Sequence, residues 1–363
     1  MKQLILGLLA LTFFGGEASA QVVGMPPPSK AAARKFGWAG AEKAREARLA
    51  LGAEFPREYQ PTVTEEEFSG RVVKLWEFAR DRNLGRHWPT GKQEIGDCVS
   101  WGWSHGVLYT LAVQLVLTGG DAALERPFQP YIYGVSRVQI GGGRINGDGS
   151  LGTWAAAGVK KHGVITEKAP GVPPYSGQVA RQWGRSGPPR EFLSLGEKSP
   201  ADVRLIRTWE EACSAIATGH AVPVCSDVGY ERIVERNNRV EGVRQGSWPH
   251  CMCFIGFDAR PGLEALYCLN SWGPDAHAPA DSYGRLDKAP PGGFWILRRD
   301  VEQMLREEDS FAVSFTGFKS APLWSRQAPV PMEDLEDAPL HVARDGARRR
   351  RGIDVLLGSR LGL

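Results

Sequence analysis

The sequence has little excess charge of either sign and, beyond its first residues, no long apolar run. Its 44 Lys and Arg residues nearly balance 41 Asp and Glu residues, so the net charge is +3 over 363 residues. A nucleic-acid surface is usually more one-sided, which argues against a nucleic-acid partner. After residue 20 no apolar run is long enough for a membrane helix. We therefore expect no membrane contact once the N-terminal segment is removed.

Cysteines are also few, which excludes two further classes of protein. Six cysteines spread over the chain do not suit a small disulfide-built fold. No second close pair of Cys or His residues accompanies Cys251 and Cys253, so we expect no zinc or other metal site and no cofactor. Buried free thiols and a disulfide both remain open. The residues concerned are Cys213, Cys225, Cys251, Cys253 and Cys268.

The N-terminus has the three parts of a secretory signal. Lys2 supplies a positive charge, and residues 4–14 form an apolar segment that is too short to span a bilayer. Ala18-Ser19-Ala20 then offers small residues before Gln21. The sequence predicts a signal peptide over residues 1–20 and a secreted or periplasmic mature protein. Its oligomeric state is left open.

The rest of the chain is globular in composition, with 42% apolar residues, 12 Trp and 14 Phe. Residues 21–85 form a lead-in, either a short pro-segment or an added part of the fold. Helices are expected there over 31–51 and 68–80. A C-terminal tail, 319–363, is rich in proline and in blocks of like charge, and we expect it to be poorly ordered.

Helical and strand-like patterns separate along the central part of the chain. Apolar stripes near helical spacing come first, and short apolar runs bounded by Gly, Pro, Asp and Asn come later. This segregation predicts an α+β fold rather than alternating β and α units. The first helix expected in this part of the chain begins near Asp97. Further helices are expected over 131–138, 153–162 and 209–218, and the one over 209–218 is expected to be the last helix of the chain. The expected strands cover 221–225, 251–257, 265–269 and 294–297.

Three residues, Cys98, His250 and Asn270, stand in an order that suits thiol catalysis. A thiol needs a base to become a nucleophile, and the base needs a third group to hold its ring. Gly96-Asp97 before a helical stripe places Cys98 at a helix N-terminus, where the helix dipole lowers a thiol pKa. Asp97 is negative and opposes this effect unless its carboxylate points away. Trp272 could cover the bond between His250 and Asn270.

Acyl transfer also requires hydrogen-bond donors for an oxyanion. The backbone N–H of Cys98 is one donor. Gln93 is the only neutral amide side chain in the segment that leads to Cys98, so its amide is the natural second. These four residues, Cys98, His250, Asn270 and Gln93, are the candidate catalytic set.

The pattern Gln-x-x-Gly-x-Cys-x-x-Trp, then His before an apolar Gly-Phe-Asp strand, then Asn-Ser-Trp-Gly, resembles the papain-like cysteine peptidases. The likeness covers about residues 86–318. It implies a helical left domain with Cys98 and a β-barrel right domain with His250 and Asn270, with the active-site cleft between them. It also implies a peptide or protein substrate. Gly147 and Gly149 look like the family's substrate-binding wall, to which we add Trp272.

The chain departs from the family pattern in four places. Ile95-Gly96-Asp97 replaces the usual Cys-Gly-Ser, so the usual local disulfide is absent. Gln93 is one residue closer to Cys98 than is usual, where Lys92 would be the alternative. The number of residues from Cys98 to His250 is just above the ~130–150 that separate the catalytic Cys and His in papain-like chains. The lead-in shows no clear inhibitory pro-segment pattern.

Two other functions remain as alternatives. Asp97-Cys98 is similar to the Asp-Cys of exported cell-wall Cys/His amidases and endopeptidases, although Asn-Ser-Trp-Gly does not suit their compact domain. A non-catalytic binding protein on a papain-like scaffold is the other. The remaining histidines are interpreted as surface or structural: His87, His105, His162, His220, His277 and His341.

Overall fold

The computed structural model describes residues 36–318 and 321–325. The predicted signal peptide over 1–20 and nearly all of the predicted tail over 319–363 lie outside these residues. The helices are α1 Ala41–Leu51, α2 Glu65–Phe68, α3 Leu75–Asp81, α4 Cys98–Thr118, α5 Gln129–Gly134, α6 Gly152–His162, α7 Gly177–Ser186, α8 Arg190–Gly196, α9 Trp209–Ala217, α10 Ala280–Arg285 and α11 Arg298–Leu305. The strands are β1 Val72–Lys74, β2 Asp202–Leu205, β3 Val222–Val228, β4 Arg232–Arg236, β5 Arg239–Val243, β6 Ser247–Asp258, β7 Ala265–Leu269, β8 Gly293–Leu297 and β9 Phe311–Ser314.

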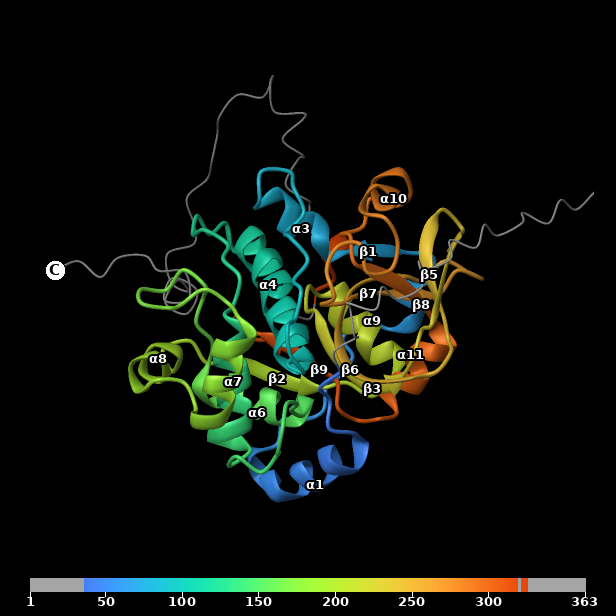
Figure 1. The fold of residues 1–363 in the computed structure, drawn as a ribbon. Helices are drawn as coiled ribbons and strands as arrows, with labels where there is room; N and C mark the ends of the chain where they lie inside the picture. The colour runs from blue at the N-terminus through green and yellow to red at the C-terminus, as the bar shows by residue number, and fades with distance from the viewer. Residues whose placement is uncertain (1–35, 319–320, 326–363) are drawn as a thin grey trace, which may run out of the picture.

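The α+β class expected from the sequence is confirmed. Figure 1 shows α4 running through the molecule, with α6, α7 and α8 on one side and most of the strands on the other. α4 is buried on nearly all faces over its first 18 residues, Cys98 to Leu115, which its almost continuous apolar sequence allows. It ends at Gly119, whose left-handed φ of 62° suits glycine.

The sheet approaches α4 closely because α4 carries glycine on that side. A Cβ at Gly102 would come 2.8 Å from the carbonyl oxygen of Met252. A Cβ at Gly106 would come 2.6 Å from the Pro223 side chain. Glycine therefore lets the first turns of α4 lie directly on β6 and β3, and this contact sets Cys98 beside the start of β6.

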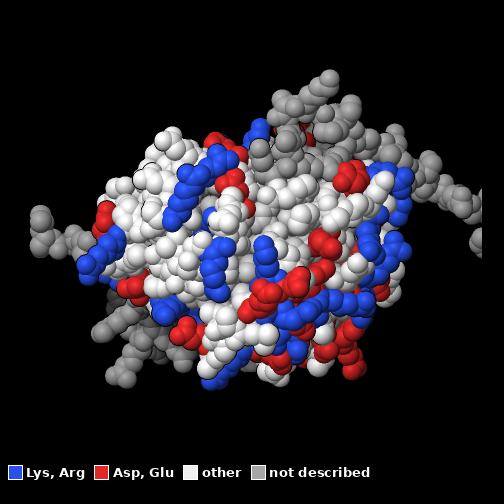
Figure 2. Space-filling view, turned by 60° about the horizontal axis from the view of Figure 1, so that its bottom comes forward, with Lys and Arg blue, Asp and Glu red and all other residues white. Residues whose placement is uncertain are grey.

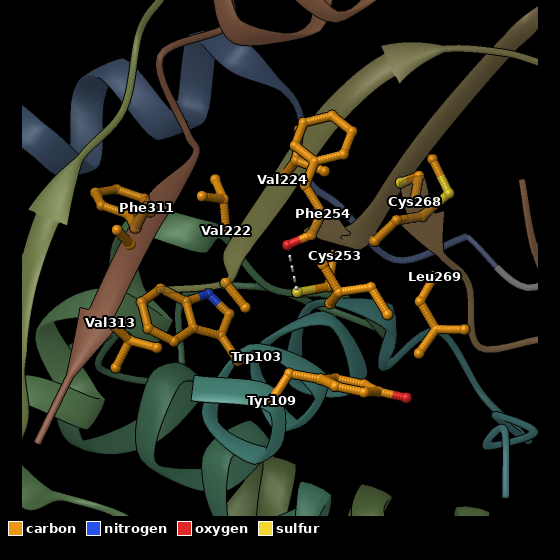
Figure 3. Close-up of a cluster of buried hydrophobic side chains, with 14 of the residues drawn as sticks. Trp103, Tyr109, Val222, Val224, Cys253, Phe254, Cys268, Leu269, Phe311 and Val313 are labelled. Atoms are coloured by element: carbon orange, nitrogen blue, oxygen red, sulfur yellow. Dashed lines mark hydrogen bonds between the residues drawn. The ribbon is translucent and has the colours of Figure 1, made fainter. Parts of the chain in front are cut away.

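The main sheet has seven strands. Six follow the order β1-β6-β7-β8-β5-β4, and β3 pairs with β6 outside this path. The pairings between described residues run as an open path from β1 to β4. β6 is the longest strand, with 12 residues, and pairs antiparallel with β1, β3 and β7. The part of the core beside α4 is filled by aromatic and aliphatic side chains from α4, β3, β6, β7 and β9 (Figure 3).

Part of the lead-in belongs to this core. β1 extends the sheet beside β6, and Trp76 on α3 is 1% exposed and packs against Tyr267. The expectation of one helix over 68–80 is wrong at its start. Residues Val72–Lys74 are a strand because pairing with the edge of β6 outweighs their local helical pattern.

Two further expectations about elements need correction. The helix expected over 209–218 is not the last, because α10 and α11 follow it. The hairpin of β4 and β5 was not predicted from the sequence. It turns at Asn237 and Asn238, which both have positive φ, and its strands carry many charged residues that obscure the alternation of a half-buried strand.

Charges of both signs lie interspersed on the face shown in Figure 2. No helix in the described part of the chain is long and apolar enough to cross a membrane. Within residues 36–318 and 321–325 no group of three or more His, Cys, Asp or Glu side chains could hold a metal ion. All six cysteines are buried and free.

Candidate active site

Cys98 is the first residue of α4 and is fully buried. Asp97 is the N-cap residue, but its side chain does not cap the helix. Instead its carboxyl oxygen Oδ2 accepts a hydrogen bond of 3.0 Å from the Tyr175 hydroxyl. That hydroxyl in turn accepts from the backbone N–H of Glu94 at 3.0 Å. The N–H groups of the first turn are therefore left without a side-chain cap beside the thiol.

Burial raises the pKa of Asp97 to about 8, against the lowering effect of the Tyr175 hydrogen bond. At neutral pH this carboxyl is therefore mostly protonated and carries little charge. A protonated Asp97 opposes the helix dipole at Cys98 less than a charged one, and its side chain is held toward Tyr175. Ionised Asp97 still raises the pKa of Cys98, so burial reduces the conflict expected from the sequence without removing it.

His250 and Asn270 are placed by neighbouring strands of the sheet. His250 lies in β6, and Asn270 directly follows β7, which pairs with β6. The Nε2 atom of His250 lies 2.8 Å from Oδ1 of Asn270. The same oxygen accepts from the backbone N–H of Ser271 at 2.7 Å. Because this oxygen only accepts, Nε2 carries the proton and Nδ1 of His250 is the basic nitrogen.

Nδ1 of His250 makes no hydrogen bond to any residue that the structure describes. Trp272 covers the imidazole, with ring centroids 4.7 Å apart and planes 33° apart. Burial lowers the pKa of His250 to about 4, and the Asn270 hydrogen bond opposes this shift. The imidazole is thus neutral near pH 7, in the form that can accept a proton.

The pKa of Cys98 moves in the direction opposite to the sequence expectation. Burial is the main cause that raises it well above its usual range, and the neighbouring Cys251 thiol adds to the increase. Backbone hydrogen bonds from Cys251 and Gly37 lower it only in part. With the site closed, both the thiol and the imidazole are therefore neutral. The helix dipole alone does not outweigh the loss of water.

The site is closed by the lead-in residues Phe36 to Ala39. The carbonyl oxygen of Gly37 accepts from the backbone N–H of Ser150 at 2.8 Å, and the N–H of Ala39 donates to the Ser150 carbonyl at 3.0 Å. On the other side, the N–H of Trp38 donates to the carbonyl of Pro249 at 3.2 Å. We call residues 36–39 the cover segment. Its main-chain hydrogen bonds join Ser150, the residue after Gly149, to Pro249 near the start of β6.

The side chains of Phe36 and Trp38 hold the cover segment against the rest of the protein. The Phe36 ring stands edge-on to His250 and Trp272, at centroid distances of 5.9 and 5.7 Å. Trp38 is 5% exposed, and its indole N–H donates to the Asp309 carboxylate at 2.7 Å. A substrate cannot reach Cys98 while these contacts hold.

Gln93 lies against the turn that follows β7. Its backbone N–H donates to the carbonyl of Ser271 at 2.8 Å, and its Oε1 accepts from the Ser271 hydroxyl at 2.7 Å. One N–H of its amide donates to the carbonyl of Ile95 at 2.9 Å. Lys92 is exposed, whereas Gln93 is 4% exposed. Of these two side chains, only that of Gln93 is buried, and it lies against Ser271 and Ile95.

The two glycines of the predicted substrate wall differ in their surroundings. Gly149 has a φ of 124°, and a Cβ there would lie 3.0 Å from the Gly37 carbonyl oxygen. A Cβ at Gly147 would meet nothing within 4 Å. Buried Arg137 holds the loop by donating to the carbonyls of both glycines, at 2.8 Å for Gly147. Gly149 therefore borders the cover segment directly, and Gly147 stands further out.

The structure thus brings His250 into direct contact with Asn270 and Trp272 and sets Gln93 against Ser271, at the start of β6 and the end of β7. Cys98 lies beside Cys251, the residue after His250, but makes no hydrogen bond to Nδ1 of His250. Sequence reasoning missed His277 in this group. It was interpreted as surface or structural, but it is 3% exposed and its Nε2 lies 2.9 Å from Nδ2 of Asn270. Its position seven residues after Asn270, in a loop rich in Pro and Ala, gives no sequence signal of this contact.

The cover segment was also missed, because no motif in the sequence couples Phe36-Gly37-Trp38 to residues so distant along the chain. His105, one of the histidines interpreted as structural, is buried on α4. Burial lowers its pKa to about 3, so it stays neutral throughout the physiological range.

Neither a scan against protein-family models nor a search of curated proteins gives a match to this sequence.

Among solved structures, xylellain, a cysteine protease from Xylella fastidiosa, matches at 12% identity and a TM-score of 0.46, over 82% of this chain and 97% of its own. The ragweed pollen allergen Amb a 11, a cysteine protease in its proform, matches at 14% and 0.47, over 77% of each chain. Digestive procathepsin L 3 of Tenebrio molitor matches at 16% and 0.45, over 74% of this chain and 79% of its own. Structural neighbours of this chain are thus cysteine proteases at low identity.

Proposed function

We propose that this chain is a thiol-dependent peptidase that uses Cys98, His250 and Asn270. The observation that carries the proposal is the 2.8 Å contact between Nε2 of His250 and Oδ1 of Asn270. It leaves Nδ1 as an unbonded base in the same site as a thiol at a helix N-terminus. A thiol, a base and a group that orients the base are the three parts that nucleophilic catalysis by cysteine requires. In the closed site Nδ1 makes no hydrogen bond to the Cys98 thiol, so the two have to come together during the reaction.

In the proposed reaction, Nδ1 of His250 takes the proton of Cys98, and the sulfur attacks the carbonyl carbon of the peptide bond. The Cys98 N–H, with the Gln93 amide as the other candidate donor, stabilises the oxyanion. The C–N bond then breaks as the imidazolium gives its proton to the leaving amine. A thioester remains, and a water molecule that His250 deprotonates hydrolyses it to the acid and the free thiol.

Among the residues that the structure describes, the cover segment is the part that has to leave for this reaction to begin. Removal of the whole lead-in to residue 85 would take away β1, Trp76 and the rest of α3, which belong to the core. We therefore place any activating cut or displacement before α1, and assign residues 41–85 to the folded domain. Opening would return water to the site and so favour the ion pair of thiolate and imidazolium.

A peptide-directed thiol-reactive probe, together with a denatured protein as substrate, tests the proposal. Once the cover segment has been cut or displaced, we expect labelling at Cys98 and cleavage of the denatured protein. Cys98→Ala should abolish both, and Cys213→Ala should keep both, because Cys213 is buried in α9 away from the site. Cleavage that persists in Cys98→Ala would contradict the proposal. Release of fragments from peptidoglycan but not from protein would favour the cell-wall alternative. An opened protein without labelling at Cys98 would favour the binding protein.

A further inference from the structure

Asn270 is held from two sides, and the second side is a histidine. Its Oδ1 faces His250, and its Nδ2 lies 2.9 Å from Nε2 of His277. Asn270 is fully buried and His277 is 3% exposed, so no bulk water competes for these bonds. Asn270 therefore bridges two imidazoles, one through its oxygen and one through its nitrogen.

We infer that His277 is a positioning residue, which locks the Asn270 amide and thereby sets the proton on Nε2 of His250. This inference rests on the proposed function. The Nδ2 atom of an amide can only donate, so Nε2 of His277 accepts and its proton lies on Nδ1. A fixed acceptor at this point keeps the amide nitrogen turned away from His250.

A reversed amide would disable the base. Nδ2 of Asn270 would then face Nε2 of His250, which would have to accept, and the His250 proton would move to Nδ1. That nitrogen could no longer take the proton of Cys98. In the reversed orientation the amide nitrogen of Asn270 would also face the backbone N–H of Ser271, so that two donors would stand opposite each other. His277 and the Ser271 N–H thus select the same orientation from opposite ends of the amide.

The surroundings of His277 hold its ring in place. Its ring packs edge-on against Phe294, at a centroid distance of 4.6 Å, and lies nearly parallel to Trp248 at 6.2 Å. It is also 5.8 Å from Trp272, the ring that covers His250. Gly273, with a φ of 97°, turns the chain after Asn270 and donates its N–H to the Gly91 carbonyl at 3.0 Å. This turn brings His277 back over Asn270.

Two substitutions distinguish the role of His277 as a hydrogen-bond acceptor from the packing of its ring. His277→Phe keeps an aromatic ring among Phe294, Trp248 and Trp272 but removes the acceptor. His277→Gln replaces the ring by a side chain whose amide oxygen can accept from Asn270. We expect His277→Phe to lower kcat on the order of tenfold with little change in KM, about the effect of one lost hydrogen bond. His277→Gln should recover most of this loss, and neither change should add to Asn270→Ala.

The proton position on His250 gives a readout that needs no activity. In the inactive Cys98→Ala background, nitrogen NMR should find His250 protonated on Nε2, and His277→Phe should shift part of the population to Nδ1. If His250 keeps its tautomer in His277→Phe, or if Phe and Gln lower kcat equally, the positioning role is wrong. If the tautomer shifts as expected but the unmodified chain cleaves no peptide, the proposed function fails and the positioning role stands. Thermal unfolding of each variant shows that the comparison is made on folded protein.

Discussion

Gly37 lies so close to Gly96 that a Cβ on Gly37 would come within 1.9 Å of the Gly96 carbonyl oxygen. No contact of that length is tolerated, and the atom in the way belongs to the backbone two residues before Cys98. The cover segment and the turn before Cys98 are therefore joined by a contact that only glycine allows.

Gly37→Ala should displace the cover segment and expose Cys98. We expect a thiol reagent to modify Cys98 several-fold faster in this variant, because the segment cannot keep its main-chain position. The measurement is the rate of alkylation at Cys98, followed by mass spectrometry of the peptides. Gly284→Ala is the matched control, since a Cβ there meets nothing within 4 Å. An unchanged rate in Gly37→Ala would show that the segment does not limit access.

Gln93→Ala should lower turnover by about 10²–10³, the usual cost of one oxyanion donor. Lys92→Ala should have a far smaller effect, because the Lys92 side chain is exposed and that of Gln93 lies against Ser271. Steady-state kinetics on a peptide substrate measures both. The reverse ranking would mean that the loop before Cys98 uses the other residue. Far-ultraviolet circular dichroism verifies that Gln93→Ala remains folded.

Asp97→Asn should change how stability depends on pH. The native carboxyl titrates at about 8, whereas an exposed one titrates near 3.8. Between these values the native state keeps a proton that the unfolded state has lost, so the stability of the unmodified protein falls as pH rises through this range. An amide does not titrate, so the difference in Tm between Asp97→Asn and the unmodified protein should grow in favour of Asn from pH 4.5 to pH 8. Exposed Asp121→Asn is the control and should show no such trend. A constant difference would mean that Asp97 is charged in the native state.

The exported protein should begin at Gln21. Ala18-Ser19-Ala20 provides the small residues that a signal peptidase requires. These residues lie outside the described part, so the test is chemical: N-terminal sequencing of protein from the culture medium or periplasm. Ala18→Arg should block processing, and Ala32→Arg, beyond the cut, should not. A soluble cytoplasmic pool that keeps Met1 would contradict export.

Sequence patterns were sufficient where structure follows from neighbouring residues. The run from Ala265 to Leu269 is a strand over the same five residues, because it is apolar throughout and is bounded by polar residues. Cys98 stands at the start of a helix, as Gly96-Asp97 and the apolar stripe indicated. The contact of His250 with Asn270 also lies where the motifs placed it.

Sequence patterns failed where the structure depends on contacts between residues that lie far apart in the chain. Val72–Lys74 reads as helix and forms a strand because the edge of β6 was available. The pKa of Cys98 depends on Gly37 and on burial, which a residue-by-residue reading of the helix start does not contain. His277 reaches Asn270 through the turn at Gly273, and no periodicity predicts that path.

The Asp309 carboxylate holds more than the Trp38 indole. It also accepts from the N–H of Gly152 at 2.8 Å and from the N–H and hydroxyl of Thr153 at 2.5 and 2.7 Å. These three donors belong to the first two residues of α6, and Asp309 stands just before β9. Loss of the Trp38 contact alone would leave this buried carboxylate hydrogen-bonded to α6. The residue that anchors the cover segment is therefore also a brace between α6 and β9, and this brace does not depend on the segment.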